Sequence, residues 1–373
     1  MKGRVLAINT GSTSTKIGFF IDGKILFEQN LVHSVSDLSK YASVMEQDLM
    51  RRDAITEFLS EKGVSLADID IVMSRAGLIT PVRTGVYEVT DIMKKALIEG
   101  RNGVHACNLS GLLAADIAAE INEDRKRKGI EGECHAYIAD PPMADEMLPE
   151  AKVGGLPEFP RRALCHALNS RAMVRRYAKE HGIADYKALT IIVAHMGGGS
   201  SVTLHRDGKI IDTNDAHGGD GPISAERAGS VPAYPLVEMC FSGKYTKEEI
   251  KKRLVGKGGA VAWFGTNDFR EIAKNAEEGD TRSRTFISGY CLSVAKYIAA
   301  LSTDVCGKVD AIILTGGIAN NRKMMSEIEE RVSFIAPVAV YPGENELESL
   351  ADNGYRILSG EFEVKTYSGS CGE

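Results

Sequence analysis

The chain has 373 residues, a formal net charge of −6 and a hydrophobic content of 43%. This length is too great for one ordinary core, so we expect two domains. The negative charge argues against a nucleic acid partner, no apolar run reaches the ~20 residues of a membrane helix, and the N-terminus lacks the pattern of a signal peptide. Seven scattered cysteines without a Cys-x-x-Cys pair indicate reduced thiols, as expected in the cytoplasm.

Two similar segments stand in the two halves of the chain. The first, NTGSTSTK, starts at Asn9 after the apolar run RVLAI, and the second, HMGGGSSV, starts at His195 after LTIIVA. The starts are 195 − 9 = 186 residues apart, and the Asp-Gly-Lys triplets that follow, at Asp22 and Asp207, are 207 − 22 = 185 apart. Asp-Gly between apolar runs is a strong hairpin signal, because type I′ turns need positive φ. We therefore interpret the chain as two related halves rather than as two unrelated hairpins.

Helical and strand patterns fill the rest of the chain. Apolar residues at helical spacing predict helices over 36–62, 105–128, 168–181 and 281–306, and apolar runs predict buried strands before Arg75 and within 309–321. The Pro- and Gly-containing stretch 143–156 predicts a boundary between a domain 1–145 and a domain 146–348. A final helix, 349–373, is expected to pack back on the first domain, and the closing YSGSCGE is expected to be frayed.

The two Gly/Ser/Thr loops suit phosphate binding. Such loops present backbone N–H groups and hydroxyls without bulky side chains. Two of them facing each other across a cleft would hold the phosphates of one nucleotide, with Lys16 supplying a charge for the γ-phosphate. The sequence contains no Walker A pattern, so a P-loop is not the device used here.

These features resemble the superfamily of actin, sugar kinases, heat-shock chaperone ATPases and acetate kinases. Blocks in the expected order extend the resemblance to the acetokinase family over nearly the whole chain: INTGSTSTKIGFF, SRAGLITPVRTGVY, HACNLSG, IADPPMADEM, LCHALNSRA, VAHMGGGSSV, DGPISAERAGSVP, TNDFREI, LTGGIANN and YPGENELESLA. The resemblance implies an α/β fold with two duplicated ribonuclease-H-like (actin-like ATPase) domains and an interdomain cleft. It also implies a reaction in which ATP and a short fatty acid give ADP and an acyl phosphate.

Within the family, the blocks look like those of members that phosphorylate butyrate. Arg75 is followed by AGL where acetate kinases have His-Gly-Gly, Asp140 is followed by PP rather than TAFH, and the second loop reads MGGGS rather than LGNGS. Butyrate is therefore the expected substrate. The alternatives are a branched-chain acid such as isobutyrate, acetate or propionate, and, from another class, a non-enzymatic nucleotide-gated binding protein.

The resemblance also implies roles for four site residues. Arg75 would bind the acyl carboxylate and Arg227 the transferring phosphoryl group. His166 would donate a hydrogen bond to the developing negative charge, and Asp140 would organise the metal and Arg75. No general base is required, because the carboxylate nucleophile is already ionised at neutral pH. The alternatives are a surface ion pair for Arg75, a structural loop for Arg227, a core histidine and a turn cap before Pro141.

The expected cofactors are ATP and Mg²⁺. The residues expected at the nucleotide are Asn9, Ser12, Ser14, Lys16, His195, Gly197, Gly198, Gly199, Asp268, Arg270, Gly317, Ile318 and Asn321. Asp140 and Glu346 are expected to serve the metal, with Glu344 as the alternative to Glu346 and a solvated helix N-terminus as the competing explanation. His105 either joins the site or orients the helix that follows it. The family resemblance further implies a homodimer or a larger homo-oligomer.

Overall fold

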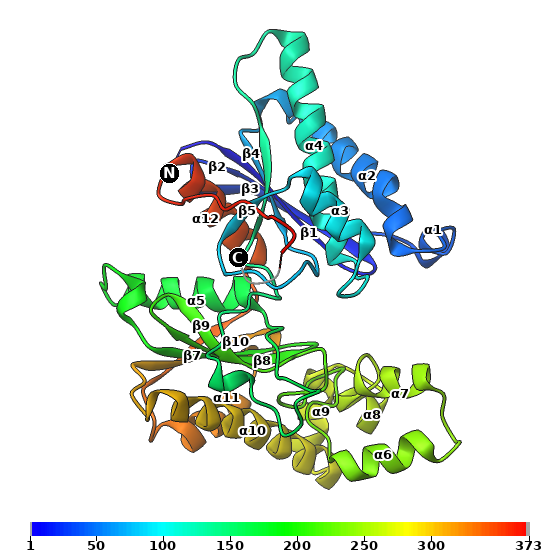
Figure 1. Ribbon diagram of the computed structural model, residues 1–373, viewed down its shortest axis with the longest axis vertical. Helices are drawn as coiled ribbons and strands as arrows, with labels where there is room; N and C mark the ends of the chain where they lie inside the picture. Colours follow the sequence, from blue (N-terminus) through cyan, green and yellow to red (C-terminus); the bar gives the residue numbers. More distant parts are fainter. Residues whose placement is uncertain (1, 371–373) are drawn as a thin grey trace. The chain divides into compact units, whose positions relative to one another are not determined.

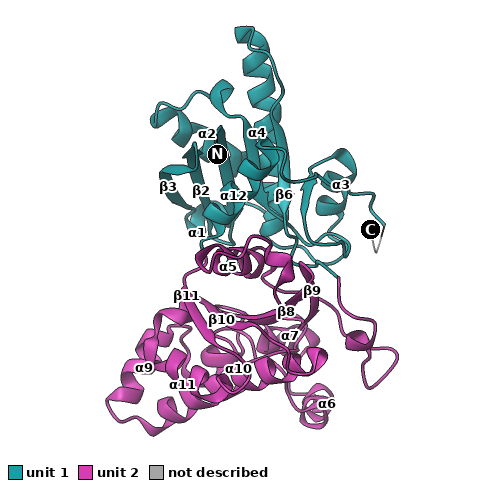
Figure 2. Cartoon of the chain, turned by 90° about the vertical axis from the view of Figure 1, so that its left-hand side faces the viewer, with its two compact units in different colours: residues 1–145, 345–373 teal, residues 146–344 magenta. Residues whose placement is uncertain are grey.

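The computed structural model describes residues 2–370, which form two compact units. Residues 1–145 and 345–373 make up the first unit, and residues 146–344 make up the second (Figure 2). The chain therefore passes from the first unit to the second once and then returns. Each unit contains one β-sheet with helices on both of its faces (Figure 1).

The first unit contains a six-stranded sheet in the order β3-β2-β1-β4-β6-β5. Its strands are β1 (Arg4–Thr10), β2 (Ser14–Ile21), β3 (Lys24–Val32), β4 (Ile71–Arg75), β5 (Val86–Glu88) and β6 (His135–Ala139). Its helices are α1 (Val35–Leu38), α2 (Asp48–Glu61), α3 (Asp91–Glu99), α4 (Cys107–Lys128) and α12 (Glu346–Leu358). The strands β1 to β3 are antiparallel, whereas β1, β4 and β6 run parallel to one another.

Strand β1 is buried on both faces, which explains its unbroken apolar run. Leu6 and Ile8 belong to the core that includes residues of α2 and α4. Val5 lies on the opposite face, where it and Met73 approach Gly354 of α12 so closely that a side chain at Gly354 would collide with them. Because successive side chains of a strand point to opposite faces, this pattern places helices on both sides of the sheet.

The second unit contains a five-stranded sheet in the order β11-β10-β7-β8-β9. Its strands are β7 (Ile191–Met196), β8 (Ser200–Arg206), β9 (Lys209–Thr213), β10 (Ala311–Gly316) and β11 (Val338–Pro342). Its helices are α5 (Ala167–Glu180), α6 (Ala233–Phe241), α7 (Lys247–Leu254), α8 (Gly259–Phe264), α9 (Phe269–Glu277), α10 (Thr281–Ser302) and α11 (Arg322–Val332). Ile192 and Leu314 pack with α10 and α11, whereas Val193 and Ile313 pack with α5 on the other face (Figure 1).

The backbone confirms the internal repeat. Each sheet has three antiparallel strands followed by two parallel ones, with equivalent orders β3-β2-β1-β4-β6 and β9-β8-β7-β10-β11. Asp22 and Asp207 both have positive φ, 50° and 54°, and so do the glycines that follow them, as a type I′ turn requires. The register of the second strand shifts between Phe19 and Phe20, and again 185 residues later, between Leu204 and His205.

The register also locates the one-residue difference between the two loops. Asn9 pairs with Lys16, and His195 pairs with Ser201, so the offset is 186 in the first strand of the hairpin and 185 in the second. The missing residue therefore lies inside the loop. As a result, Ser200 corresponds to Thr15 and not to Ser14.

The helix after the last strand of each repeat belongs to the other unit. In the chain, α5 follows β6 of the first sheet but packs on β7 and β10, and α12 follows β11 of the second sheet but packs on β1 and β4. The two units are thus related by an exchange of equivalent helices.

Three expectations about elements were wrong. The helix predicted over 36–62 is instead α1, a short 3-10 helix over Val44–Gln47 and α2. Ser34 caps α1 and the Ser39 hydroxyl bonds the carbonyl of Ser36, so serine side chains satisfy the backbone where a longer helix was expected. The final helix ends at Leu358. The end is not frayed at Tyr367, which is only 1% exposed, and residues 371–373 lie outside the described residues.

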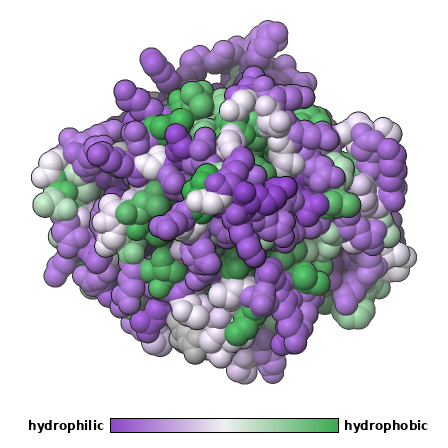
Figure 3. Space-filling model, turned by 90° about the horizontal axis from the view of Figure 1, so that it is seen from above, coloured by the Kyte–Doolittle hydropathy of each residue, from purple (hydrophilic) through white to green (hydrophobic). Residues whose placement is uncertain are grey.

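The Gly- and Pro-containing region that holds α6 to α9 was not assigned to helices from the sequence. Over residues 2–370, no helix is long and apolar enough to cross a membrane. On the face drawn in Figure 3, hydrophilic side chains predominate, and the hydrophobic ones form small separate groups.

Candidate active site

Three residues expected in separate roles meet at one edge of the first sheet. Glu346 begins α12, and one of its carboxylate oxygens accepts a hydrogen bond from the side-chain amide of Asn9 at the end of β1. Its other oxygen lies 3.6 Å from Nη1 of Arg75, the last residue of β4. The Glu346 side chain is 11% exposed, so this ion pair is largely protected from solvent. Glu346 therefore orients the guanidinium that was expected to bind the acyl carboxylate.

Asp140 lies directly beside this cluster. Arg75 pairs with Ala139 in the sheet, so Asp140 is the next residue along the neighbouring strand. Asp140 is 3% exposed and has a left-handed φ of 43°. Its backbone N–H donates to the carbonyl of Gly85 at 2.8 Å, and its Oδ1 accepts from the N–H of Gly85 at 3.0 Å. These two hydrogen bonds hold a backbone conformation that an L-residue rarely adopts.

The start of α4 adds two side chains that face the same cluster. Nδ1 of His105 lies 3.1 Å from Sγ of Cys107, the first residue of α4. Burial raises the pKa of the Cys107 thiol, with a weaker opposing effect of Arg75 and a reinforcing effect of Glu346. Cys107 therefore lies within electrostatic reach of both. It was not predicted, because a cysteine after a helix start carries no distinctive sequence signal.

In the second unit, two histidines expected at the site stack on each other. The rings of His166 and His195 are 3.9 Å apart between centroids and tilted by only 11°. Nδ1 of His166 lies 2.8 Å from Oγ of Ser201, and Nδ1 of His195 lies 3.0 Å from Oδ1 of Asn169. Each ring is thus fixed at one nitrogen by a neutral side chain, which leaves Nε2 as the nitrogen for other partners.

Asn169 also links this pair to Glu344. Its side-chain amide donates to the backbone carbonyl of Glu344 at 2.6 Å, while Nε2 of His195 lies 3.8 Å from Oε1 of the same residue. Glu344 is therefore part of the second unit, whereas Glu346, two residues later, is part of the first. The sequence gave no sign that these two glutamates separate.

Arg227 contacts the second glycine loop. Its Nη1 donates to the carbonyl of Ala216 at 2.6 Å, and its guanidinium packs so closely on Gly199 that any side chain there would collide with it. The glycine at this position is therefore needed for the approach of the arginine, in addition to its expected exposure of backbone N–H groups.

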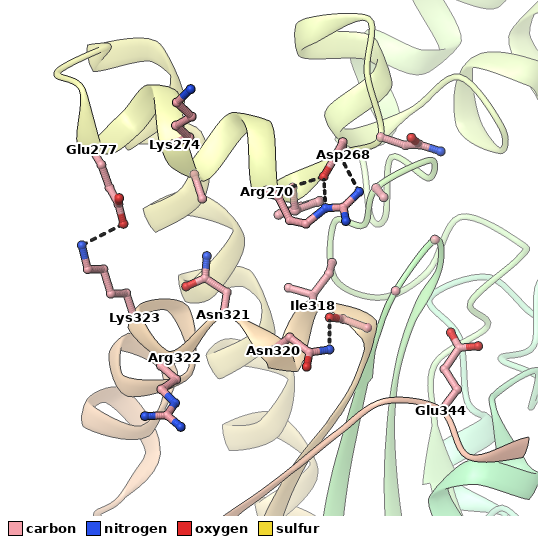
Figure 4. A pocket seen from close by; sticks show the side chains of 17 residues that line it. Asp268, Arg270, Lys274, Glu277, Ile318, Asn320, Asn321, Arg322, Lys323 and Glu344 are labelled. Carbon is pink, nitrogen blue, oxygen red and sulfur yellow. Dashed lines mark hydrogen bonds and ion pairs between the residues drawn. The ribbon is translucent and has the colours of Figure 1, made fainter.

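A cavity of about 930 Å³ opens next to the same loop (Figure 4). Its lining includes seven of the residues expected at the nucleotide: Gly197, Gly198, Asp268, Arg270, Gly317, Ile318 and Asn321. Gly199 and His195 stand in the adjoining loop and strand, and Asn9, Ser12, Ser14 and Lys16 belong to the first unit. Figure 4 shows Glu344 at one end of the cavity and the ion pair of Lys323 with Glu277, 2.7 Å long, at the other.

Asp268 and Arg270 form a paired wall of this cavity. Nε and Nη2 of Arg270 lie 2.9 and 2.8 Å from the two carboxylate oxygens of Asp268. Hydrogen bonds from Arg270 lower the pKa of Asp268 to about 2, so the pair stays ionised at neutral pH. Asp268 is also the N-cap of α9, and Asn321 is the N-cap of α11. A structural role for both residues is therefore real and coexists with their place in the cavity.

Comparison with known proteins gives the same result as the geometry. A sequence model described as the acetokinase family matches residues 161–353. The chain is 44% identical to "Butyrate kinase 1" of Clostridium acetobutylicum, over 98% of this chain and 99% of that protein. The chain belongs to the acetokinase family. It is also 43% identical to a "Probable butyrate kinase" of Bacteroides thetaiotaomicron, again over 98% of this chain and 99% of that protein.

Solved structures of the acetokinase fold superpose on nearly the whole chain. An acetate kinase of Porphyromonas gingivalis has a TM-score of 0.76 at 18% identity and covers 95% of this chain and 100% of its own. A propionate kinase of Francisella tularensis has a TM-score of 0.73 at 18% identity and covers 93% of this chain and 98% of its own. At this identity the likeness concerns the fold, and it confirms the expected pair of duplicated α/β domains.

Proposed function

We propose that the chain transfers the γ-phosphoryl group of ATP to the carboxylate of butyrate, giving butyryl phosphate and ADP. The observation that carries this proposal is the identity of 41% to 46%, over 98% of the chain, with proteins named as butyrate kinases or probable butyrate kinases. The sites described above supply what such a transfer needs, namely a nucleotide-sized cavity and a set of oriented cations.

The acyl carboxylate is bound, in this proposal, by Arg75. A guanidinium can hold a carboxylate through two hydrogen bonds, which fixes the direction of the attacking oxygen. Glu346 and the neighbouring Asp140 support this role, because they restrict the arginine from two sides of the strand end. Placement of the attacking oxygen is the main contribution the protein makes, since the nucleophile is already charged.

The nucleotide occupies the cavity of the second unit. Ile318 offers an apolar contact to the base, and the charged pair Asp268–Arg270 offers hydrogen bonds to the sugar. Gly197 and Gly198 line the same cavity and present backbone N–H groups suited to phosphate oxygens. The first-unit loop residues Asn9, Ser12, Ser14 and Lys16 are proposed to act on the phosphates as well.

The histidine pair and Arg227 are proposed to stabilise charge during transfer. If the Ser201 hydroxyl donates to Nδ1 of His166, the ring carries its proton on Nε2 and can donate there. His195 is proposed to lie near the γ-phosphate, and Arg227, which packs on Gly199, is proposed to neutralise the transferring group. His105 is proposed only to orient Cys107 and the start of α4.

Mg²⁺ is proposed as the metal that accompanies ATP. Between residues 2 and 370 no cluster of three or more histidine, cysteine or acidic side chains could enclose a metal ion. This fits Mg²⁺, which keeps several waters and binds through one or two carboxylates together with substrate phosphates. Asp140 and Glu346 would hold it, the latter through water because Asn9 and Arg75 already contact its carboxylate. When bound, the ion neutralises phosphate charge.

The test is trapping of the product with hydroxylamine, which converts an acyl phosphate to a coloured hydroxamate. The protein incubated with ATP, Mg²⁺ and butyrate is expected to give hydroxamate and equimolar ADP. Release of ADP without hydroxamate, or nucleotide binding without turnover, would instead favour a nucleotide-gated binding protein.

Chain length is tested by ranking kcat/KM over acetate, propionate, butyrate, isobutyrate, valerate and hexanoate. Each buried methylene contributes ~0.8 kcal/mol, so butyrate gains ~1.6 kcal/mol over acetate, on the order of tenfold in kcat/KM. We expect the maximum at butyrate, with isobutyrate above hexanoate. A maximum at acetate would leave the carboxylate kinase standing and remove butyrate.

A homo-oligomer in the cytoplasm completes the proposal. The apolar helix α6 contains no buried residue, and its Tyr234 and Phe241 are both 87% exposed. Exposed apolar side chains gathered on one helix are typical of an interface. We expect light scattering to give at least a dimer, and Phe241→Ser to weaken it. A wild-type monomer at micromolar concentration would contradict this part.

A further inference from the structure

Arg51 of α2 is completely buried beneath the first phosphate loop. Its exposure is 0%, and it makes six hydrogen bonds. Nη1 donates to the carbonyls of Gly11 and Ser14 at 2.9 and 3.0 Å, and Nη2 donates to the carbonyl of Ser12 at 3.0 Å. Thus one guanidinium binds three of the four carbonyls in the turn 11–14.

The remaining hydrogen bonds fix the guanidinium itself. Nη1 also lies 3.2 Å from Oγ1 of Thr15, while Nε and Nη2 donate to Oε1 of Gln47 at 3.2 and 2.8 Å. All of these acceptors are neutral, so no carboxylate among them balances the positive charge. Burial lowers the pKa of Arg51, but an arginine stays protonated at neutral pH. A buried cation therefore stands directly behind the loop.

This arrangement has two effects on an anion bound to the loop. Carbonyl oxygens repel phosphate oxygens, and Arg51 engages the carbonyls of Gly11, Ser12 and Ser14, which keeps them turned toward α2. In addition, the charge acts through protein rather than through water, so it is weakly screened. The second loop has a comparable partner, because the Arg227 guanidinium packs on Gly199. In both repeats an arginine from outside the hairpin thus packs against the phosphate loop.

We propose that Arg51 is a positioning residue of the first phosphate loop, and that its uncompensated buried charge strengthens binding of the terminal phosphates of ATP. This inference rests on the proposed function, because that function assigns the loop 9–16 to the phosphates. It adds a residue that contacts the loop and not the nucleotide.

The sharpest test changes the charge and not the shape. Gln47→Glu keeps the size of the side chain and both acceptor bonds but places a carboxylate against Arg51. Calorimetric dissociation constants are measured for ATP, ADP and AMP with Mg²⁺. We expect affinity for ATP to fall by about tenfold while that for AMP stays within about twofold, with a melting temperature no lower than wild type. An unchanged ratio of ATP to AMP affinity would overturn the electrostatic part.

Arg51→Lys and Arg51→Met test the positioning part. Lysine keeps the charge but not the planar fork, so we expect an intermediate loss for ATP, whereas methionine should give the largest loss. Arg52→Met is the matched control, because the neighbouring Arg52 pairs with Glu120 at 3.1 Å and has a 27% exposed side chain. If Arg51→Met is too unstable to purify, Gln47→Glu and Arg51→Lys still decide. Equal losses for all three nucleotides in Arg51→Lys would indicate a purely structural arginine and overturn the proposal.

The outcome is separable from failure of the proposed function. If wild-type protein forms no acyl phosphate but Gln47→Glu still weakens ATP selectively, the function fails and the role of Arg51 in phosphate binding stands. If wild-type protein forms acyl phosphate and the variants bind nucleotides as it does, only the inference fails.

Discussion

The segment after α12 is expected to hold Asp140 in place through Lys365. The backbone N–H of Lys365 donates to the carbonyl of Val86 at 2.8 Å, and its Nζ donates to the carbonyl of Thr84 at 2.6 Å. Gly85, between these two, exchanges two hydrogen bonds with Asp140. Lys365 thus covers the free edge of β5 and presses on the glycine that fixes Asp140.

Lys365→Met should loosen this segment by about 2 kcal/mol. A hydrogen bond from a charged donor contributes ~1.5–3 kcal/mol, and partial exposure of Lys365 favours the lower end of that range. The cation 5.9 Å from the ring of Tyr87 adds a few tenths. A loss of ~2 kcal/mol in local opening corresponds to roughly thirtyfold faster amide exchange at Gly85, Lys365 and Asp140. Hydrogen exchange with mass spectrometry measures this directly.

Lys95→Met is the control for this measurement. Lys95 lies on α3 of the same unit with a 77% exposed side chain, 3.9 Å from Glu99, so its removal should cost less than ~0.5 kcal/mol. The proposed role of Asp140 predicts that kcat falls in Lys365→Met and not in Lys95→Met. Equal exchange rates at Gly85 and Asp140 in the two variants would refute the reasoning.

Three further predictions concern the site and the stability of the first unit. Arg75→Lys keeps a charge but loses the planar fork, so KM for butyrate should rise far more than KM for ATP in steady-state assays; unchanged values of both would remove Arg75 from the acyl site. Lys16→Ala should lower kcat strongly at saturating ATP and Mg²⁺ with an unaltered circular dichroism spectrum, and a wild-type kcat would exclude Lys16 from the mechanism. Burial, and then the facing Asp116, raise the pKa of Asp48 to about 6. Folding therefore favours its protonated form, so its contribution to stability is greatest below about pH 4 and is lost as pH rises through 6. Asp48→Asn should raise the melting temperature near pH 8, with a gain that disappears on acidification; a gain independent of pH would contradict this cause.

The sequence predicted the repeat because the signals are local. Asp22-Gly23 and Asp207-Gly208 report their turn type through residue chemistry alone, and their spacing survives in the register of the strands. Likewise, an apolar run of alternating faces such as that around Val193 can only be a strand buried on both sides.

The sequence did not predict contacts that join distant segments. Arg51 is 40 positions from Gly11, and Lys365 is 281 from Thr84, so no local pattern shows either pairing. Glu344 and Glu346 present the opposite problem. They look interchangeable in GENELE, but Asn345, with a φ of 43°, stands where the chain crosses from one unit to the other.

The division of the chain has a consequence for synthesis on the ribosome. The second unit is continuous, whereas the first needs the segment after Glu344 to cover the β1 and β4 face that Leu350, Ala351 and Tyr355 help to bury. During translation the first 145 residues therefore emerge with that apolar face uncovered, and it stays so until the last codons are read. A premature stop codon after residue 344 would remove Glu346, Lys365 and this cover together. The nascent protein thus depends on its final exon-sized stretch both for solubility and for its chemistry.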